Sequence, residues 1–187
     1  MAKFCDPVLL WVIMLFSGCT SQSYTTKELQ QAERRSRDMA VEIHAIQNDV
    51  KRQLKLFNDV FSRYQRKEIA SAVPELYAED AFLNDRIHSV TGNRAIARYF
   101  DSTFEKMHEC EFHIHDTTFG KLDVYVRWTM RIQLSEGDEF MEFLGMSQFR
   151  FNQEGKIIYH QDYWDFSELM GEIRVLRSIV KYVKGRA

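Results

Sequence analysis

The chain has 187 residues, 45% of them hydrophobic, and a formal net charge of −2. Fourteen Phe, eight Tyr and three Trp residues supply enough bulky side chains for one well-packed domain. The near balance of charge disfavours nucleic-acid binding, and three cysteines are too few for a disulfide scaffold, so we expect one domain that is stabilised by its core and has no nucleic-acid partner.

The first feature along the chain is an apolar stretch that ends in small residues and a cysteine. Lys3 precedes the apolar run 8–16, which is too short to span a membrane because a transmembrane helix needs about 20 residues. The sequence LFSGC at 15–19 resembles a bacterial lipobox. We therefore expect 1–18 to be a lipoprotein signal peptide and Cys19 to be the lipidation site. An ordinary signal peptide and an uncleaved anchor are the alternatives.

The residue after Cys19 bears on the location of the protein. In lipoproteins of this type, a residue other than Asp at this position implies sorting to the outer membrane, and Thr20 stands here. The resemblance thus implies an outer-membrane lipoprotein of the bacterial cell envelope that faces the periplasm. Residues 19–42 are mostly polar and are expected to form a tether, in part helical, that carries no chemistry.

Helical periodicity begins at Ile43. Apolar residues recur there at steps of three and four, which predicts a first core helix with one buried face. These residues are Ile43, Ile46, Val50, Leu54, Phe57, Phe61 and Tyr64. Pro74 begins or interrupts a short second helix, and Asn93 is positioned to cap a third, amphipathic helix that runs through 95–104.

The remaining segments alternate between apolar and polar residues, as β-strands do. Residues 81–85 and 88–91 predict a hairpin, and three long strands are expected over 111–119, 123–134 and 139–151, followed by a last strand over 156–164. Helices come first and a run of antiparallel strands follows. This order predicts an α+β fold in which the helices pack against one curved antiparallel sheet.

Several of these segments together resemble the nuclear transport factor 2-like superfamily, which includes SnoaL-like polyketide cyclases and ketosteroid isomerases. The resemblance rests on 76–85 (LYAEDAFLND), Gly92, 95–100 (AIARYF) and 149–157 (FRFNQEGKI). It implies a cone-shaped fold in which three helices close a strongly bent sheet around an apolar pocket. We expect this SnoaL-like domain to occupy 43–187.

Strand alternation indicates which side chains face that pocket, because residues two apart share a face. On the last strand, the pattern of the isomerases implies that Trp164 faces inward, and His160 and Asp162 then do so too. The outward face of 139–151 carries Gln148 and Arg150. Gly145 is interpreted as a position where the sheet bends. The residues expected to bind a ligand are Phe61, Tyr99, Trp128, Met130, Phe143, Ser147 and Trp164.

Three ionisable residues are the candidates for chemistry. Asp85 aligns with the proton-transfer base of ketosteroid isomerases, but Phe61 and Ser147 replace the two hydrogen-bond donors of that family, so steroid isomerisation is not expected. A buried Asp162 needs a partner, and His160 lies about 6.6 Å away along the strand. Asp85, His160 and Asp162 are therefore candidate general acids and bases. The alternatives are a turn residue and a satisfied structural pair.

A last helix is expected after Asp165, which forms a capping box with Glu168. Its apolar face begins at Leu169, and its basic residues are Arg174, Arg177, Lys181, Lys184 and Arg186. This basic amphipathic helix lies on an anionic membrane or caps the pocket in one interpretation, and it packs on the domain with solvated charges in the other.

Three functions remain open from the sequence. The first is a lipid-anchored binding module for a small apolar or amphipathic ligand. The second is an enzyme of the same fold, an isomerase, dehydratase or hydrolase. The third is a structural role in which the sheet face forms a homodimer. No cofactor or metal is expected. A cavity where the ionisable groups converge favours catalysis, and a dry cavity with paired groups at its rim favours binding.

Overall fold

The computed structural model describes residues 25–62, 66–172, 182–183 and 185. The expected signal peptide, the lipidation site Cys19 and the basic residues Arg174, Arg177, Lys181, Lys184 and Arg186 lie outside this part of the chain.

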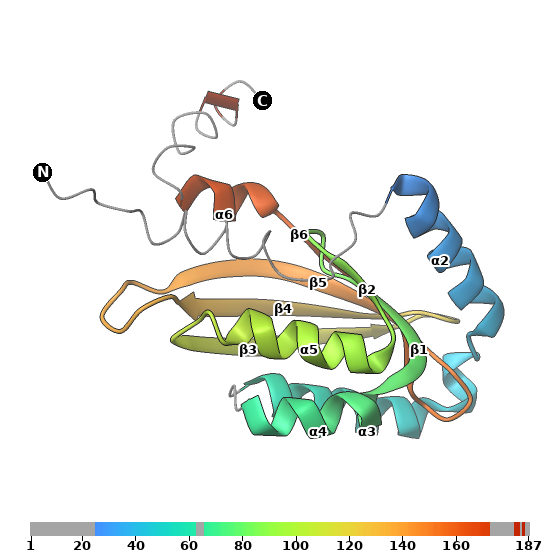
Figure 1. Ribbon diagram of the computed structural model, residues 1–187. Coiled ribbons are helices and arrows are strands. Elements are labelled where there is room, and N and C mark those ends of the chain that lie inside the picture. The colour runs from blue at the N-terminus through green and yellow to red at the C-terminus, as the bar shows by residue number, and fades with distance from the viewer. Residues whose placement is uncertain (1–24, 63–65, 173–181, 184, 186–187) are drawn as a thin grey trace, which may run out of the picture.

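Helices cover the concave face of a curved sheet (Figure 1). After the 3-10 turn η1 (Ile43–Ala45) come α3 (Gln47–Ser62), α4 (Arg66–Leu76) and later α5 (Asn93–Phe104). The apolar stripe on α3 is buried as its periodicity predicts. Pro74 lies inside α4, and the helix ends two residues after it. The residue that precedes α5 is Gly92, with φ of 91°, so Asn93 begins the helix and does not cap it.

Six strands form the sheet in the order β2-β1-β6-β5-β4-β3. Their bounds are β1 (Tyr77–Asn84), β2 (Ser89–Thr91), β3 (Glu109–Phe119), β4 (Val124–Gln133), β5 (Met141–Phe151) and β6 (Ile157–Trp164). The predicted α+β fold is confirmed, with a curved sheet that does not close into a barrel. The expectation of a wholly antiparallel sheet is wrong for one pair, because β1 and β6 run parallel. The long connection between them, which contains α5 and four strands, lets the chain enter β6 in the direction of β1.

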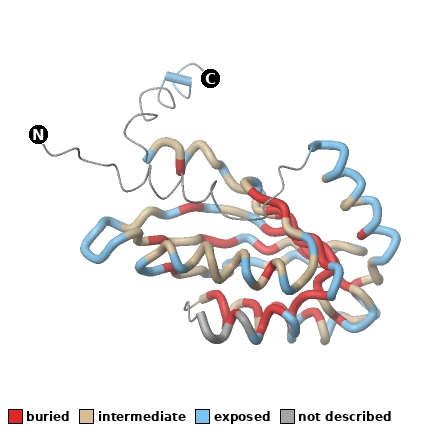
Figure 2. Tube along the Cα trace, viewed as in Figure 1, coloured by how far each residue is buried: buried red, intermediate tan, exposed pale blue. Residues whose placement is uncertain are grey.

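Buried residues follow the middle of this sheet and the inner faces of the helices (Figure 2). A second, smaller core lies next to α6 (Phe166–Glu172) and contains Cys110, Ile132, Phe143 and Leu169. Asp165 caps α6, since its Oδ1 accepts hydrogen bonds from the backbone and the hydroxyl of Ser167 at 2.8 and 2.5 Å. Among the described residues, no helix combines the length and the apolar character needed to cross a bilayer.

The helix α2 (Thr26–Met39) lies within the expected tether and contacts β6. The outward-facing Arg150 of β5 explains this contact, because its side chain is fully buried under α2. Its guanidinium donates to the backbone oxygen of Glu33 at 2.7 Å, to its carboxylate at 2.8 Å and to the Ser36 hydroxyl at 2.8 Å. Its Nε donates to Asp123 at 2.6 Å. The prediction that Arg150 faces away from the pocket is therefore correct, but α2 covers this side chain.

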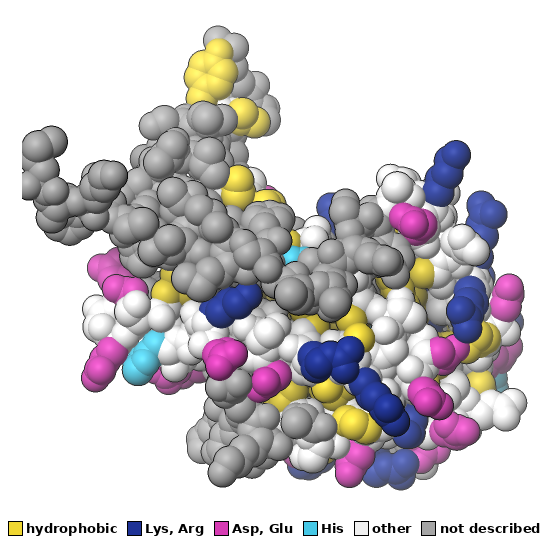
Figure 3. Space-filling model, viewed as in Figure 1, with side chains coloured by type: hydrophobic (Ala, Val, Ile, Leu, Met, Phe, Trp, Pro, Cys, Tyr) yellow, Lys and Arg dark blue, Asp and Glu magenta, His cyan; other side chains and the backbone are white. Residues whose placement is uncertain are grey.

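The segment after α2 is also bonded to the domain. The backbone N–H of Val41 donates to the carbonyl of Phe151 at 3.1 Å, and that of Ile43 donates to the carbonyl of Lys121 at 2.9 Å. The part of 19–42 that the structure describes is thus attached to the sheet over much of its length. The visible surface carries Lys, Arg, Asp and Glu side chains interspersed, as the small net charge suggests (Figure 3).

Candidate functional site

A cavity of about 120 Å³ lies between α3, α5 and the concave face of the sheet. Its walls are mainly aromatic and aliphatic, and its polar residues come from the turn after β1, from α5 and from the strands β5 and β6. The apolar wall consists of Phe57, Phe61, Ile87, Phe100, Phe104, Met107, Phe112, Trp128, Met130 and Trp164. The polar residues are Asp85, Tyr99, Thr103, Ser147, His160 and Asp162.

A chain of hydrogen bonds converges on the Asp162 carboxylate. His160 Nε2 lies 2.9 Å from Asp162 Oδ1, and the Ser147 hydroxyl donates to the same oxygen at 2.5 Å. Trp128 Nε1 donates to the Ser147 hydroxyl oxygen at 2.9 Å. Tyr77 OH lies 2.8 Å from His160 Nδ1. His160 and Asp162 therefore face inward, and a buried network surrounds them.

The direction of this chain follows from the donors available. An indole N–H can only donate, so Ser147 accepts from Trp128 and directs its own proton to Asp162. Burial, followed by the charge of Asp162, raises the pKa of Tyr77 well above its usual value, so its hydroxyl stays protonated and donates to His160 Nδ1. We assign the remaining His160 proton to Nε2, which donates to Asp162.

Both hydrogen bonds to Asp162 end on Oδ1. Its other oxygen, Oδ2, accepts no hydrogen bond from the residues that the structure describes. The side chain is only 17% exposed and lines the cavity. A partly buried carboxylate oxygen with an open acceptor position is the natural place for a ligand to donate a hydrogen bond.

Asp85 forms the second polar group of the cavity. Its Oδ1 accepts from the backbone N–H groups of Ile87 and His88 at 2.9 and 2.6 Å, and Tyr99 OH donates to its Oδ2. Trp164 Nε1 donates to the Asp85 carbonyl at 2.8 Å. Burial raises the pKa of Asp85 despite the hydrogen bonds from Tyr99 and the His88 backbone, which lower it. Asp85 thus holds its turn and also lines the cavity.

Comparisons with known proteins assign the chain to a family. The model of the SnoaL-like domain matches residues 57–160, more than half of the sequence. The chain belongs to the SnoaL-like family. The matched region includes Asp85, Tyr99, Ser147 and His160 and ends two residues before Asp162.

Solved structures share the nuclear transport factor 2-like fold of this SnoaL-like domain. An epoxide hydrolase of Mycobacterium tuberculosis, described as LEH-like, is 18% identical with a TM-score of 0.55, over 74% of this chain and 97% of that one. A hypothetical protein of Catenulispora acidiphila with a ketosteroid isomerase-like fold, in complex with trimethylamine, is 15% identical with a TM-score of 0.55, over 65% of this chain and 91% of that one. A putative SnoaL-like isomerase of Agrobacterium tumefaciens is 16% identical with a TM-score of 0.52, over 63% and 98%. No curated protein sequence matches the chain.

The structure of the SnoaL-like domain brings nine of the ten predicted site residues to one cavity. They are Asp85, His160, Asp162, Phe61, Tyr99, Trp128, Met130, Ser147 and Trp164. Phe143 lies outside it, in the second core, where its ring packs 5.7 Å from that of Trp164. The reason is its position on β5, which places it in the same core as Leu169 of α6.

Sequence reasoning missed Tyr77, the residue that orients His160. Tyr77 begins β1, and its side chain is completely buried. It meets His160 because β1 pairs in parallel with β6, a contact between residues 83 positions apart. No local pattern in the sequence reports this pairing.

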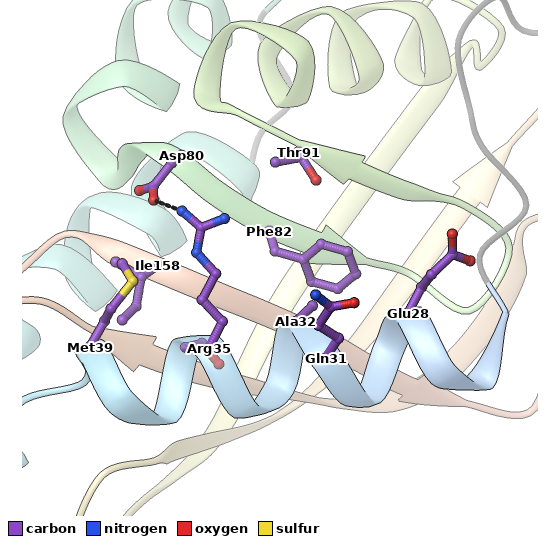
Figure 4. Close-up of a pocket in the computed structure, with 10 residues that line it drawn as sticks. Glu28, Gln31, Ala32, Arg35, Met39, Asp80, Phe82, Thr91 and Ile158 are labelled. Carbon is purple, nitrogen blue, oxygen red and sulfur yellow. Dashed lines mark hydrogen bonds and ion pairs between the residues drawn. The ribbon is translucent and has the colours of Figure 1, made fainter.

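A second hollow, of about 190 Å³, lies between α2 and the strands β1 and β2 (Figure 4). Arg35 crosses it and pairs with Asp80 at 2.9 Å, and Phe82 and Thr91 lie beside them. The two charged side chains are 67% and 47% exposed, so water screens their attraction. The carboxyl group of Asp85 and the hydroxyl group of Tyr99, whose pKa values burial raises, line the aromatic cavity instead.

Proposed function

We propose that this SnoaL-like domain binds a small, largely apolar molecule whose polar group donates a hydrogen bond to Asp162. The observation that carries the proposal is the open Oδ2 of a carboxylate at the polar end of an aromatic cavity. A dry protein cavity of about 150 Å³ accepts benzene, so a volume of about 120 Å³ suits a ligand of similar size. The trimethylamine in the structure from Catenulispora acidiphila supports a ligand of this small size and largely apolar character.

The experiment is native mass spectrometry of the purified protein, which detects a small molecule that co-purifies with it. Asp162→Asn keeps the shape of the side chain but removes its charge, and we expect this variant to lose the molecule while it remains folded. Asp116→Asn is the matched control, because Asp116 lies on the outer surface and pairs with Arg127. Retention of the molecule by Asp162→Asn would contradict the proposal.

The second candidate is an enzyme of the same fold, and the convergence of three ionisable residues favours it. Asp162 is held as a general base by Ser147 and His160, and Asp85 has a raised pKa next to Tyr99, which suits a general acid. The names of two structural relatives, an epoxide hydrolase and a putative isomerase, support this class of chemistry. If the protein is an enzyme, Asp162→Asn should lose turnover and keep substrate binding. If it is a binding module, the same variant should lose ligand binding.

We further propose that Cys19 anchors the domain to the bacterial outer membrane, facing the periplasm, and that the basic C-terminal residues contact the lipid surface. The LFSGC sequence and the position of Thr20 support the anchor. Cys19→Ala should abolish metabolic labelling with a fatty acid and release the protein from the membrane fraction. Unchanged labelling of this variant would contradict the anchor.

The outer sheet face is the proposed site of a homodimer. Leu144, Met146 and Tyr163 are 61%, 37% and 42% exposed on neighbouring strands, which supports an apolar contact there. Leu144→Lys should lower the mass measured by sedimentation if this face forms the dimer, and the same mass for both proteins would contradict it.

A further inference from the structure

The cavity combines negative charge with aromatic walls. Of the 16 described residues that line it, eight are aromatic, Asp85 and Asp162 carry carboxyl groups, and none is Lys or Arg. A carboxylate in such surroundings is costly unless an opposite charge compensates it. Among the described lining residues the basic side chain is therefore that of His160, which contacts Asp162 Oδ1 and leaves Oδ2 open.

Apart from the imidazole of His160, the protein groups that donate hydrogen bonds to the two carboxyl groups are hydroxyl and backbone N–H groups, which carry no charge. Asp162 accepts from a hydroxyl and from the Nε2–H of His160, whose Nδ1 accepts from Tyr77. Asp85 accepts from two backbone N–H groups and from the Tyr99 hydroxyl. Neutral donors orient a carboxylate but leave its charge in place. A neutral apolar ligand would displace water from Asp162 without supplying a counter-charge.

The aromatic rings favour the same kind of ligand. Phe112 and Trp128 line the wall with their ring centroids 5.2 Å apart, and Phe57 lies 5.9 Å from Phe112. The face of an aromatic ring carries partial negative charge and attracts a cation within about 6 Å of its centre. Acidic and aromatic groups together form the standard environment for an alkylammonium ion.

We propose that the ligand of this cavity is a small organic cation, an alkylammonium whose positive nitrogen faces Asp162 and whose alkyl groups contact the aromatic wall. The inference rests on the proposed binding function and names its ligand class. The observations that carry it are the two carboxyl groups, the eight aromatic residues and the lack of Lys and Arg among the described lining residues.

The test compares two probes of the same shape that differ in charge, choline and 3,3-dimethyl-1-butanol, in which a carbon replaces the quaternary nitrogen. Isothermal titration calorimetry on the full chain should give at least about tenfold tighter binding of choline, which corresponds to 1.4 kcal/mol. Asp162→Asn should abolish this preference, and Asp116→Asn, on the outer surface, should retain it. Phe112→Leu removes one aromatic face and should weaken the binding of choline more than the binding of the alcohol. This variant tests the proposal if Asp162→Asn does not fold.

The outcomes separate the cation from the binding function. If the alcohol binds as tightly as choline, the cation proposal is wrong and the proposed pocket for a small apolar molecule stands. If neither probe binds at millimolar concentration, the cation proposal is also wrong. The pocket function is then judged separately by the molecule that co-purifies in native mass spectrometry.

Discussion

The indole ring of Trp128 lies over Gly145, its partner across β4 and β5. A Cβ atom at Gly145 would meet Cη2, Cζ2 and Cζ3 of the indole at less than 3.0 Å. The glycine therefore makes room for the ring, whose Nε1 reaches Ser147 next to the site. The interpretation of Gly145 as a bending position did not foresee this contact.

Gly145→Ala is expected to lower the free energy of unfolding by about 1–3 kcal/mol, because the indole and the strand must move apart. Denaturant unfolding of the variant measures this loss. In a double-mutant cycle, Trp128→Leu should remove most of the effect, since the ring atoms that clash are then gone. Additive losses in the cycle would contradict the proposed clash.

Trp128→Ala is expected to cost about 3–5 kcal/mol, the usual loss for a buried large aromatic side chain. Trp128 is 3% exposed and packs against Phe112, so its removal leaves a cavity. Arg127→Ala on the opposite face of β4 is the control and should cost less than about 1 kcal/mol. Equal losses for the two variants would mean that the inward face of β4 is misassigned.

Arg150→Met is expected to detach α2 and to lower the free energy of unfolding by about 2–3 kcal/mol, because Glu33 and Asp123 lose a buried charged donor. Hydrogen exchange of the amides in Thr26–Met39 should accelerate. Arg37→Met is the matched control. Arg37 pairs with the same Glu33 at 2.7 Å but is 57% exposed, so its removal should cost less than about 1 kcal/mol. Unchanged exchange in Arg150→Met would show that other contacts hold the helix.

Asp85 predicts a specific pH dependence of stability. Burial raises its pKa in the folded protein above the ordinary value of 3.8, so the folded state holds this proton more tightly than the unfolded state does. The free energy of unfolding should therefore fall as pH rises from the ordinary value to the raised one, and the Asp85 contribution should stay constant above that range. Asp85→Asn removes this fall. Denaturant unfolding at a series of pH values measures the free energy of unfolding of both proteins. The stability of the variant relative to the wild type should increase as pH rises. A difference in free energy that does not change with pH would contradict the raised pKa.

The sequence predicts the inner face of the sheet well, because the side chains of a strand alternate between its two faces. Once one aromatic residue is known to face inward, the orientation of the other residues of that strand follows. Trp164, assigned through the family resemblance, correctly orients His160 and Asp162. Two features escape this reasoning. Tyr77 reaches His160 through a long-range parallel pairing, and α2 attaches through Arg150 although its own sequence is almost entirely polar. Hydrophobic periodicity detects neither of them, because both depend on single polar contacts between distant segments.

If Cys19 carries a lipid as proposed, the attachment of α2 also limits how far the pocket can lie from the lipid surface. An unattached segment over 19–42 would reach about 80 Å when fully extended, whereas Thr25 follows Cys19 by only six positions, an extended span of about 20 Å. The contacts of the Arg150 guanidinium with α2 then leave only about 20 Å of extended chain between the lipid and the domain. The pocket would then take its ligand from the layer of water next to that membrane.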